Sequence, residues 1–507
     1  MDPEYGLTVH RGRHSVFATD PRFGPLPRHS LAFVMGTQEP LSGVDAAWLR
    51  MDEPTNLMTI TAILVLEDPM DVATLKELLR ERFLGFTRFR QRVRDPDGSP
   101  YWELDPHFDL DRHVHRSALP GEAGRTELKA RVSELMSDPL DREKPLWEMQ
   151  LIEDYRRGSV VIARLHHCIA DGMALLQVLL SLTDEYFDPS RFPDTDKQPH
   201  LLPGAVRGAI KTVQGTVATG RRLLTESARS LINPSHALRR VKQGLSFGAA
   251  LSKFLSLSDD PNTLLKGELG VAQRATWSEP LDLARIKRIG HVVDAKVNDV
   301  LLGAVAGALR SYVETRDELG DTETVRALIP VNLRPPEQAF QLGNRFGLVF
   351  LDLPVGLDNR LERVLTVKQR MDAIKASAEA VAALSVLEGL GYVPLSVEDQ
   401  AVRHFSNKAS AVMTNVPGPQ EPLHLEGRRI QHIMPWVPRA GHVGLGVSIF
   451  SYDGEVRLGI ACDAGLVPDP EPIVEGFMQE FDRLADGLLP NADEGSSSTS
   501  SASAAGE

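Results

Sequence analysis

The sequence predicts an α/β protein made of two halves of comparable length. Apolar, β-branched runs of strand length alternate with stretches that repeat apolar residues at helical spacing. This alternation occurs on both sides of a basic segment, residues 204–253. A chain of 507 residues is also long enough for more than one domain. The sequence shows no internal repeat of about 20 to 50 residues, which argues against a solenoid or a propeller.

In the first half, apolar runs predict three strands: Thr59–Leu66, Met149–Glu153 and Ser159–Leu165. Helical spacing predicts three helices: Val72–Arg82, Glu127–Met136 and one that begins near Met173. Asp71 is placed to cap the first helix, because a carboxylate there accepts free amide groups of the first turn.

In the second half, apolar runs predict four strands: Val325–Val331, Phe346–Leu353, Leu445–Ser451 and Glu455–Cys462. Helical spacing predicts four helices: Leu281–Ile289, Val300–Arg316, Asn359–Ala383 and Pro472–Asp486. Asp453-Gly454 separates the last two strands, and this dipeptide is typical of a type I′ hairpin turn, which needs positive φ at both positions.

Composition shifts divide the chain into five expected parts. They are an N-terminal extension over residues 1–39, a first domain over 40–200, a basic segment over 201–265, a second domain over 266–490 and a tail over 491–507. The Ser-, Ala- and Gly-rich tail has too little apolar surface to order itself. Residues 1–34, which precede Met35, are expected to be an extension or a product of start-site choice.

The overall charge and the cysteine count exclude several function classes. The chain carries 69 acidic and 56 basic residues, a formal net charge of −13, which argues against wholesale nucleic-acid binding. We find no apolar run that could span a bilayer and no secretory signal, so a cytoplasmic protein is expected. Two cysteines, Cys168 and Cys462, cannot build a disulfide framework or a thiolate metal site.

The segment at residues 204–253 differs in charge from the rest of the chain. It contains nine basic residues and one acidic residue, a net charge of +8, which leaves −21 for the remainder. Apolar residues recur in it at roughly helical intervals. A basic amphipathic stretch suits a membrane surface or an anionic ligand, and an interdomain linker with a solvated basic face explains the pattern equally well.

The most informative motif is His166-His167-Cys168-Ile169-Ala170-Asp171-Gly172, which follows a predicted strand. A histidine at a strand end can project into a cleft and take a proton from a hydroxyl, although a packed core pair is the alternative. Cys168 is expected to point away from His167, and no serine nucleophile motif occurs nearby. The spacing of His166, His167 and Asp171 does not match known zinc helices, so no metal is expected.

The pattern His-His-x-x-x-Asp-Gly resembles the signature of the CoA-dependent acyltransferase superfamily. Further collinear segments resemble the bacterial wax ester synthase/diacylglycerol acyltransferase family, in its actinobacterial triacylglycerol synthase type. These segments are Pro40–Asp45, Pro139–Arg142, Pro145–Glu148, Val297–Val300, Pro330–Pro335, Gly343–Arg345, Asn415–Pro419 and Ser451–Gly454. The resemblance implies two chloramphenicol-acetyltransferase-like domains with the active site at their interface.

The resemblance also implies roles for particular residues. His167 is expected to be the general base, and Asp171 to pair with an arginine, for which Arg334 is the candidate. His166 would hold the loop, and Gly172 would permit a tight turn. Two further expectations carry structural alternatives. Asn298 and Asp299 lie near the active site or cap the helix that follows, and Trp147 lines the acyl tunnel or belongs to the core.

The expected function is acyl-CoA-dependent formation of triacylglycerol from diacylglycerol. Alternatives are wax ester synthesis from a long-chain alcohol, a condensation-type acyltransferase, and a non-catalytic lipid-surface protein. No cofactor is implied, because acyl-CoA is a substrate. The insoluble acceptor implies peripheral contact with a membrane or lipid-droplet surface, to which the basic segment would contribute.

Overall fold

The computed structural model describes residues 38–185, 256–316, 323–335, 341–439 and 441–489. The chain divides into two compact units, residues 1–39 and 40–507, and the features below belong to the second. The expected extension over residues 1–34, the basic segment at 204–253 and the tail after residue 490 lie outside the described residues.

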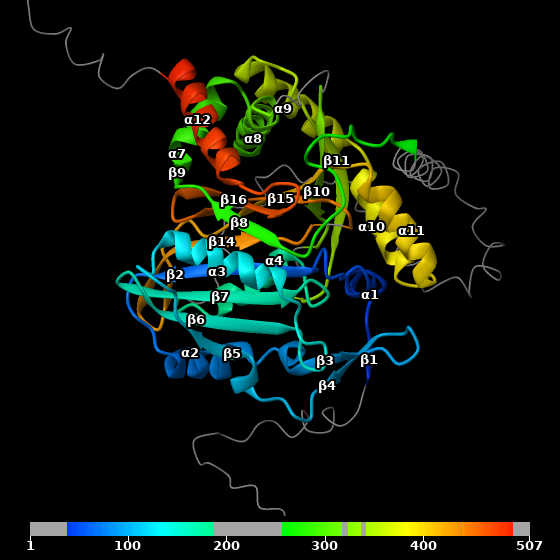
Figure 1. Ribbon diagram of the computed structural model, residues 1–507, viewed down its shortest axis with the longest axis vertical. Coiled ribbons are helices and arrows are strands. Elements are labelled where there is room, and N and C mark those ends of the chain that lie inside the picture. The colour runs from blue at the N-terminus through cyan, green and yellow to red at the C-terminus, as the bar shows by residue number, and fades with distance from the viewer. Residues whose placement is uncertain (1–37, 186–255, 317–322, 336–340, 440, 490–507) are drawn as a thin grey trace, which may run out of the picture. The chain divides into compact units, whose positions relative to one another are not determined.

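The first sheet contains six strands in the order β13-β14-β2-β7-β6-β5 (Figure 1). Their bounds are β13 His424–Leu425, β14 Arg428–Trp436, β2 Thr59–Leu66, β7 Gly158–His166, β6 Trp147–Tyr155 and β5 Val114–Ser117. Alternate side chains of β2 pack on opposite faces: Ile60 and Leu64 join the core beneath α2 and α4, whereas Ile63 and Val65 pack with α3.

The second sheet contains β11 (Phe346–Leu353), β10 (Val325–Asn332), β12 (Ala411–Pro417), β15 (Leu445–Tyr452), β16 (Glu455–Asp463) and β8 (Gln273–Trp277), in that order. The short β9 (Leu281–Asp282) also pairs with β16. Asp453 and Gly454 both have positive φ, 50° and 76°, so the predicted hairpin turn is confirmed. A further antiparallel pair joins β3 (Gln91–Arg94) and β4 (Tyr101–Leu104), and β1 covers Glu39–Pro40.

Helices enclose both sheets (Figure 1). On the second sheet, four helices share one apolar core with its strands: α7 Leu283–Val292, α8 Val297–Glu314, α9 Arg360–Ala376 and α12 Glu471–Leu488. The helices of the first half are α1 Gly43–Arg50, α2 Val72–Leu78, α3 Arg125–Ser137 and α4 Gly172–Ser181. A π-helical turn (Leu79–Phe83) follows α2, and two 3₁₀ turns cover Thr87–Arg90 and Leu110–Arg112. Among the described residues, no helix has the length and apolarity needed to cross a bilayer.

The expected single helix over Asn359–Ala383 is wrong, because the structure has two helices there. α9 ends at Ala376, and α10 covers Glu379–Leu390 before α11 begins at Leu395 and runs to Ser406. The break allows α10 to lie directly on β11. A Cβ added to Gly347 in β11 would stand 1.8 Å from the carbonyl oxygen of Ala380, so only glycine permits this approach.

Strands β13 and β14 come from the second half of the chain but complete the first sheet. β14 pairs antiparallel with β2, and its Trp436 packs with Trp277 of β8, their ring centroids being 5.6 Å apart. The second half therefore holds both sheets together, and sequence halves do not coincide with sheets.

Candidate active site

His167 lies where β7 gives way to the turn that leads into α4. Its backbone amide donates to the Met58 carbonyl at 2.7 Å, which fixes the residue beside the start of β2. The imidazole stacks on Trp48 of α1, with ring centroids 4.4 Å apart and an interplanar angle of 23°. Phe346 of β11 lies on another side at 5.6 Å. His167 is therefore held between elements of both sheets.

Burial keeps the His167 side chain neutral. It lowers the pKa to about 4, although the Asp171 carboxylate and the main-chain carbonyl of His167 itself act in the opposite direction. The ring is only 5% exposed, yet it lines a cavity. At neutral pH it is therefore a neutral imidazole, able to accept a proton.

His166 points to a different environment and holds the loop. Its Nδ1 accepts the Cys168 amide at 3.1 Å, and its Nε2 lies 3.7 Å from Oδ2 of Asp52. Asp52 also accepts from the Met58 amide at 2.7 Å and from Arg142 at 2.8 Å. Burial alone would raise the pKa of Asp52, but these partners lower it to about 2. The network supports a structural role for His166.

Asp171 caps α4 and forms the expected ion pair with Arg334. Its Oδ1 accepts the Ala174 amide at 2.9 Å, as an N-cap carboxylate does. Its Oδ2 accepts from Nη2 of Arg334 at 2.6 Å and from the Arg345 amide at 3.0 Å. Both oxygens are engaged, so Asp171 acts as a positioning residue that fixes the turn after His167.

The segment that carries Arg334 is joined to the histidine turn by backbone bonds as well. Gly343 donates to the Ile169 carbonyl at 3.0 Å and accepts from the Asp171 amide at 3.2 Å. Its φ of 96° is a conformation that strongly favours glycine. Arg334 also donates to the Gly343 carbonyl at 2.7 Å, so the pair crosses between the two halves of the chain.

Asn344 connects His167 to the start of α1. Its Nδ2 donates to the His167 carbonyl at 2.7 Å and to Oδ1 of Asp45 at 2.8 Å. Ser42 caps α1 by accepting the Asp45 amide at 3.1 Å. The motifs Pro40–Asp45 and Gly343–Arg345 thus meet behind the histidine.

Asn298 and Asp299 open α8 and have different surroundings. Asp299 is buried and accepts the Lys296 amide at 3.0 Å, so it caps the helix from inside the first turn. Asn298 lines the cavity, and its Oδ1 accepts from Nδ2 of Asn415 at 3.1 Å. The capping alternative therefore applies to Asp299, whereas Asn298 faces the site.

Two cavities meet beside His167. The larger one, of about 550 Å³, lies between the sheets and is lined by His167, Asn298, apolar side chains and three lysines. The second is enclosed almost entirely by aliphatic and aromatic side chains beneath α4. Four residues line both cavities: Gly172, Thr414, Val416 and Val437.

The expectation for Gly172 needs correction, and for Trp147 the structure decides between the two alternatives. Gly172 does not make a turn reserved for glycine, because a Cβ added there would contact nothing within 4 Å and its φ is not positive. Gly172 lies instead where the two cavities join, and a side chain there would narrow the connection between them. Trp147 lines neither cavity. It is buried, stacks on His113 at 4.5 Å and donates to the Phe89 carbonyl at 2.8 Å, so it belongs to the core.

Sequence reasoning missed Trp48, Phe346 and Asn344 as residues around His167. Trp48 has only helical spacing as a signal, and the stack on His167 depends on the tertiary fold. Asn344 lies in a quoted motif, Gly343–Arg345, so the motif located it without explaining it. In the part of the chain that the structure describes, no group of three or more acidic, His or Cys side chains is placed to hold a metal ion.

Comparisons with known proteins agree with this geometry. The family model described as "Wax ester synthase/diacylglycerol acyltransferase catalytic domain" matches residues 41–301, and "WS/DGAT C-terminal domain" matches residues 342–485. The protein named "Probable diacyglycerol O-acyltransferase tgs1" from Mycobacterium tuberculosis (strain ATCC 25618 / H37Rv) is 28% identical over 456 residues. That match covers 88% of this chain and 95% of the relative.

Solved structures show the same fold. A wax ester synthase/diacylglycerol acyltransferase from Marinobacter aquaeolei VT8 superposes with a TM-score of 0.63 at 22% identity, covering 89% of this chain and 99% of that one. The first condensation domain of the CDA synthetase has a TM-score of 0.57 at 15% identity, covering 90% and 98%. This chain is an acyltransferase that belongs to the wax ester synthase/diacylglycerol acyltransferase family, with its two-domain, chloramphenicol-acetyltransferase-like fold.

Proposed function

We propose that this enzyme transfers a long acyl chain from acyl-CoA to the hydroxyl of diacylglycerol, with His167 as the general base. The observation that carries the proposal is a neutral, buried histidine that lines a cavity between the sheets, which adjoins a second, apolar cavity at Gly172. The relative named as a diacylglycerol O-acyltransferase favours diacylglycerol as the acceptor.

In the proposed reaction, His167 takes the proton of the acceptor hydroxyl as its oxygen attacks the thioester carbonyl. The resulting oxyanion accepts a hydrogen bond from the Asn298 side-chain amide, whose Oδ1 is already occupied by Asn415. The C–S bond then breaks, and the thiolate of CoA recovers the proton from His167. The enzyme forms no covalent bond, in keeping with a site built around a base rather than a nucleophile.

A group of lysines supports acyl-CoA as the donor. Lys287 of α7, Lys296 at the start of α8 and Lys375 of α9 all line the larger cavity. Among the described residues, none of the three forms an ion pair with a carboxylate. Burial, and then the neighbouring Lys296, lower the pKa of Lys375. Asp299 and Asp372 act on Lys375 in the opposite direction but form no ion pair with it, and lysines placed together without such pairs suit the phosphate groups of CoA.

The apolar cavity supports a long acyl chain. It lies between α4 and the first sheet, and its lining includes Phe83, Leu165, Leu176 and Phe450. Each buried methylene contributes about 0.8 kcal/mol, so such a lining favours long chains over short ones. The apolar cavity would hold the chain while the lysines hold the CoA head.

A substrate panel tests this function. Labelled acyl-CoA is offered with diacylglycerol, with a long-chain alcohol and with a carrier-bound acceptor. We expect triacylglycerol as the main product. Wax ester as the main product would favour the alcohol acceptor, and transfer only to the carrier-bound acceptor would contradict the proposal.

A second experiment tests the acyl-CoA subsite. Replacing Lys296 and Lys375 by alanine should raise KM for acyl-CoA about tenfold or more, since hydrogen bonds to charged groups contribute about 1.5–3 kcal/mol. KM for an acyl-pantetheine without phosphates should stay constant. Lys368→Ala is the control, because Lys368 pairs with Asp294 at 2.8 Å outside the cavity. If the replacement raised KM equally for acyl-CoA and for acyl-pantetheine, phosphate recognition by these lysines would be ruled out.

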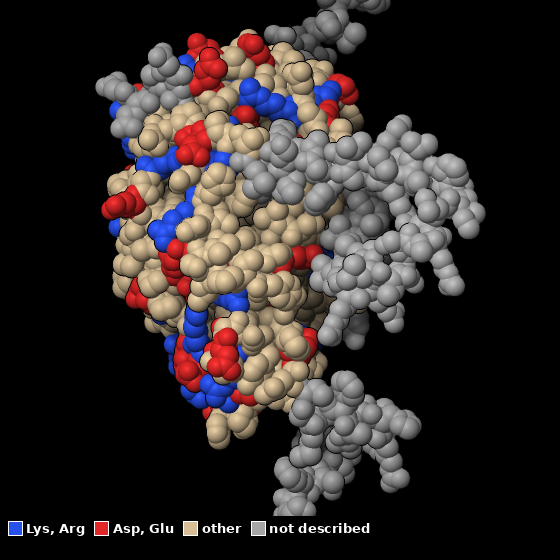
Figure 2. Space-filling model, turned by 90° about the vertical axis from the view of Figure 1, so that its right-hand side faces the viewer, with Lys and Arg blue, Asp and Glu red and all other residues tan. Residues whose placement is uncertain are grey.

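We also propose that the enzyme works at the cytoplasmic surface of a membrane or of lipid droplets, because acceptor and product are insoluble. Three large apolar side chains of the α10–α11 region are exposed: Tyr392 (70%), Leu395 (61%) and Val397 (49%). Figure 2 views the molecule from the side on which α10 and α11 lie in Figure 1, and uncharged side chains form much of that surface. Replacing the three by serine should reduce sedimentation with liposomes.

A further inference from the structure

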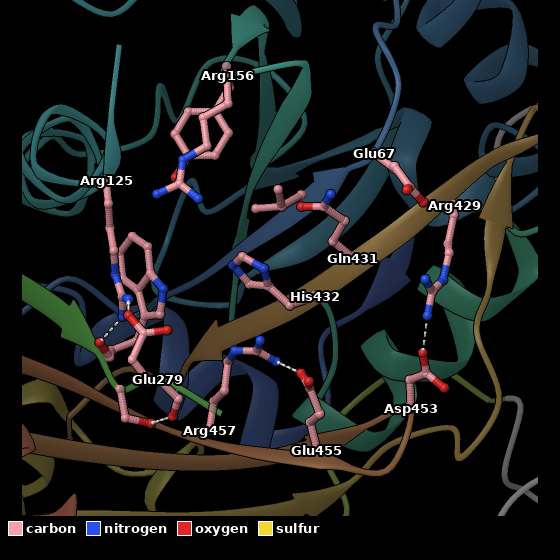
Figure 3. Close-up of a pocket in the computed structure, with 14 residues that line it drawn as sticks. Glu67, Arg125, Arg156, Glu279, Arg429, Gln431, His432, Asp453, Glu455 and Arg457 are labelled. Atoms are coloured by element: carbon pink, nitrogen blue, oxygen red, sulfur yellow. Dashed lines mark hydrogen bonds and ion pairs between the residues drawn. The ribbon is translucent and has the colours of Figure 1, made fainter. Parts of the chain in front are cut away.

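A third cavity, which is polar, lies far from the active site, where β14 joins the two sheets. It has a volume of about 360 Å³ (Figure 3). His432 of β14 lies opposite Val65 of β2, whereas Thr59 at the other end of β2 lies opposite His166. Six residues of extended chain separate Thr59 from Val65, which corresponds to about 20 Å. The cavity is therefore a site of its own.

Three arginines from three separate elements surround His432 in this cavity (Figure 3). Arg125 comes from the start of α3, Arg156 from the turn between β6 and β7, and Arg457 from β16. Arg156 occupies a left-handed backbone conformation, with φ of 56°, and its guanidinium lies 5.5 Å from the Tyr155 ring. Among the described residues, Arg156 forms no ion pair with a carboxylate.

Two carboxylates of the cavity, Glu455 and Glu279, lie closer to solvent than the guanidinium groups that they meet, whereas Asp453 (25% exposed) is more buried than its partner Arg429 (47%). Arg457 is 13% exposed and its partner Glu455 is 43% exposed. Arg125 is 24% exposed and its partner Glu279 is 71% exposed. Ion pairs with exposed partners contribute little, so they compensate poorly for two arginines taken out of water. Arg125 and Arg457 are therefore more buried than the carboxylates that compensate their charge.

The interior also contains polar atoms without hydrogen-bond partners. Within the described residues, Nε of Arg125 and Nε2 of His432 are buried and make no hydrogen bond. Burial and, to a smaller extent, Arg457, Arg125 and Arg156 together lower the pKa of His432 to about 3. His432 therefore remains neutral, and the charged groups that act on its pKa are the three arginine side chains.

We propose that this cavity binds a small phosphate-type oxyanion through Arg125, Arg156 and Arg457. Guanidinium groups that approach from three directions match the tetrahedral arrangement of phosphate oxygens better than the two coplanar oxygens of a carboxylate. Such a ligand adds a counter-charge beside Arg125 and Arg457, whose own carboxylate partners are more exposed than they are. Arg125 and Arg156 belong to the first half and Arg457 to the second sheet, so the bound anion links the two.

Thermal unfolding of the full chain with inorganic phosphate tests the proposal. Phosphate is titrated against chloride at constant ionic strength, and a parallel titration uses glycerol phosphate, which distinguishes free phosphate from a phosphomonoester. We expect a saturable rise in Tm of about 2 °C or more, because a ligand that binds only the folded state stabilises it. Isothermal calorimetry gives the affinity directly.

Arg156→Gln should weaken phosphate binding about tenfold, since one charge-assisted hydrogen-bonding group is lost. Arg156 lies exposed in a turn, so this variant retains the fold. The control is Arg403→Gln, which changes an exposed arginine of α11 that pairs with Asp399. The absence of a saturable Tm rise, or equal affinity in wild type and Arg156→Gln, would overturn the proposal.

Discussion

His167 and His432 lie at opposite ends of the first sheet, and both are kept neutral by burial. Their pKa values are lowered to about 4 and about 3. The charges around them differ, because Asp171 favours the protonated form of His167, whereas three arginines oppose protonation of His432. A nearby carboxylate lets a buried histidine receive a proton, and nearby guanidinium groups make its surroundings a site for an anion.

Removal of His167 should have the largest effect on catalysis. His167→Ala should lower kcat by about 10²–10⁴, the usual contribution of a general base, with little change in the far-ultraviolet circular dichroism. The control is His291→Ala, which changes an exposed histidine of α7. If His167→Ala retained full activity, the proposed difference between the two histidines would be wrong, because neither would then transfer protons.

Loss of the Asp171 charge should have the next largest effect, and this effect is a lower unfolding free energy. Asp171→Asn leaves Arg334 buried beside a neutral amide, and breaking such a pair costs about 3–5 kcal/mol of unfolding free energy. Urea denaturation measures this change. The exposed pair of Asp399 and Arg403 provides the control, since Asp399→Asn should cost less than about 1 kcal/mol. If Asp171→Asn and Asp399→Asn lost equal unfolding free energy, the Asp171 pair would stabilise the fold no more than a surface pair does.

A side chain at Gly172 should change acyl-chain selectivity. Gly172→Val narrows the junction of the two cavities, so kcat/KM for a long-chain acyl-CoA should fall about tenfold relative to a short-chain one. Gly172→Ala should produce a smaller change in the same direction. A uniform loss for all chain lengths would show that the apolar cavity does not hold the acyl chain. The His432 cavity has no comparable apolar extension in its lining.

The smallest expected effect concerns acid stability at His432. Its folded pKa, about 3, lies below the unfolded value near 6.5, so the unfolded chain binds more protons and stability falls as the pH drops below about 6.5. His432→Gln removes this loss. Its unfolding free energy should therefore fall by about 0.7 kcal/mol less than that of the wild type between pH 7 and pH 6, in phosphate-free buffer. If the unfolding free energies of the wild type and His432→Gln depended on pH in the same way, the folded state would not keep His432 neutral.

Local signals in the sequence predicted much of this arrangement. Asp71 caps its helix as expected, because capping depends on residues three positions apart. The turn after His167 follows from the strand that precedes it. Arg334 could be assigned to Asp171 only through the family resemblance, because the partners are separated by 163 positions.

What the sequence could not predict depends on packing between distant elements. The pairing of β14 with β2 joins segments from opposite halves, and nothing within β14 specifies its partner. The break after Ala376 has no glycine or proline to mark it and depends on the contact of α10 with β11. Trp147 could be read either way, because an aromatic residue after a proline suits a tunnel wall or a core, and the stack on His113 decides for the core.

The pH dependence of kcat/KM tests the central claim, that His167 acts as a neutral base with a lowered pKa. A base is active when it is unprotonated, so a lowered pKa extends activity to lower pH. The account predicts that kcat/KM stays level from neutral pH to about pH 5 and falls with unit slope around pH 4, while circular dichroism shows that the fold persists. A midpoint near 6.5, the ordinary value for histidine, would contradict it.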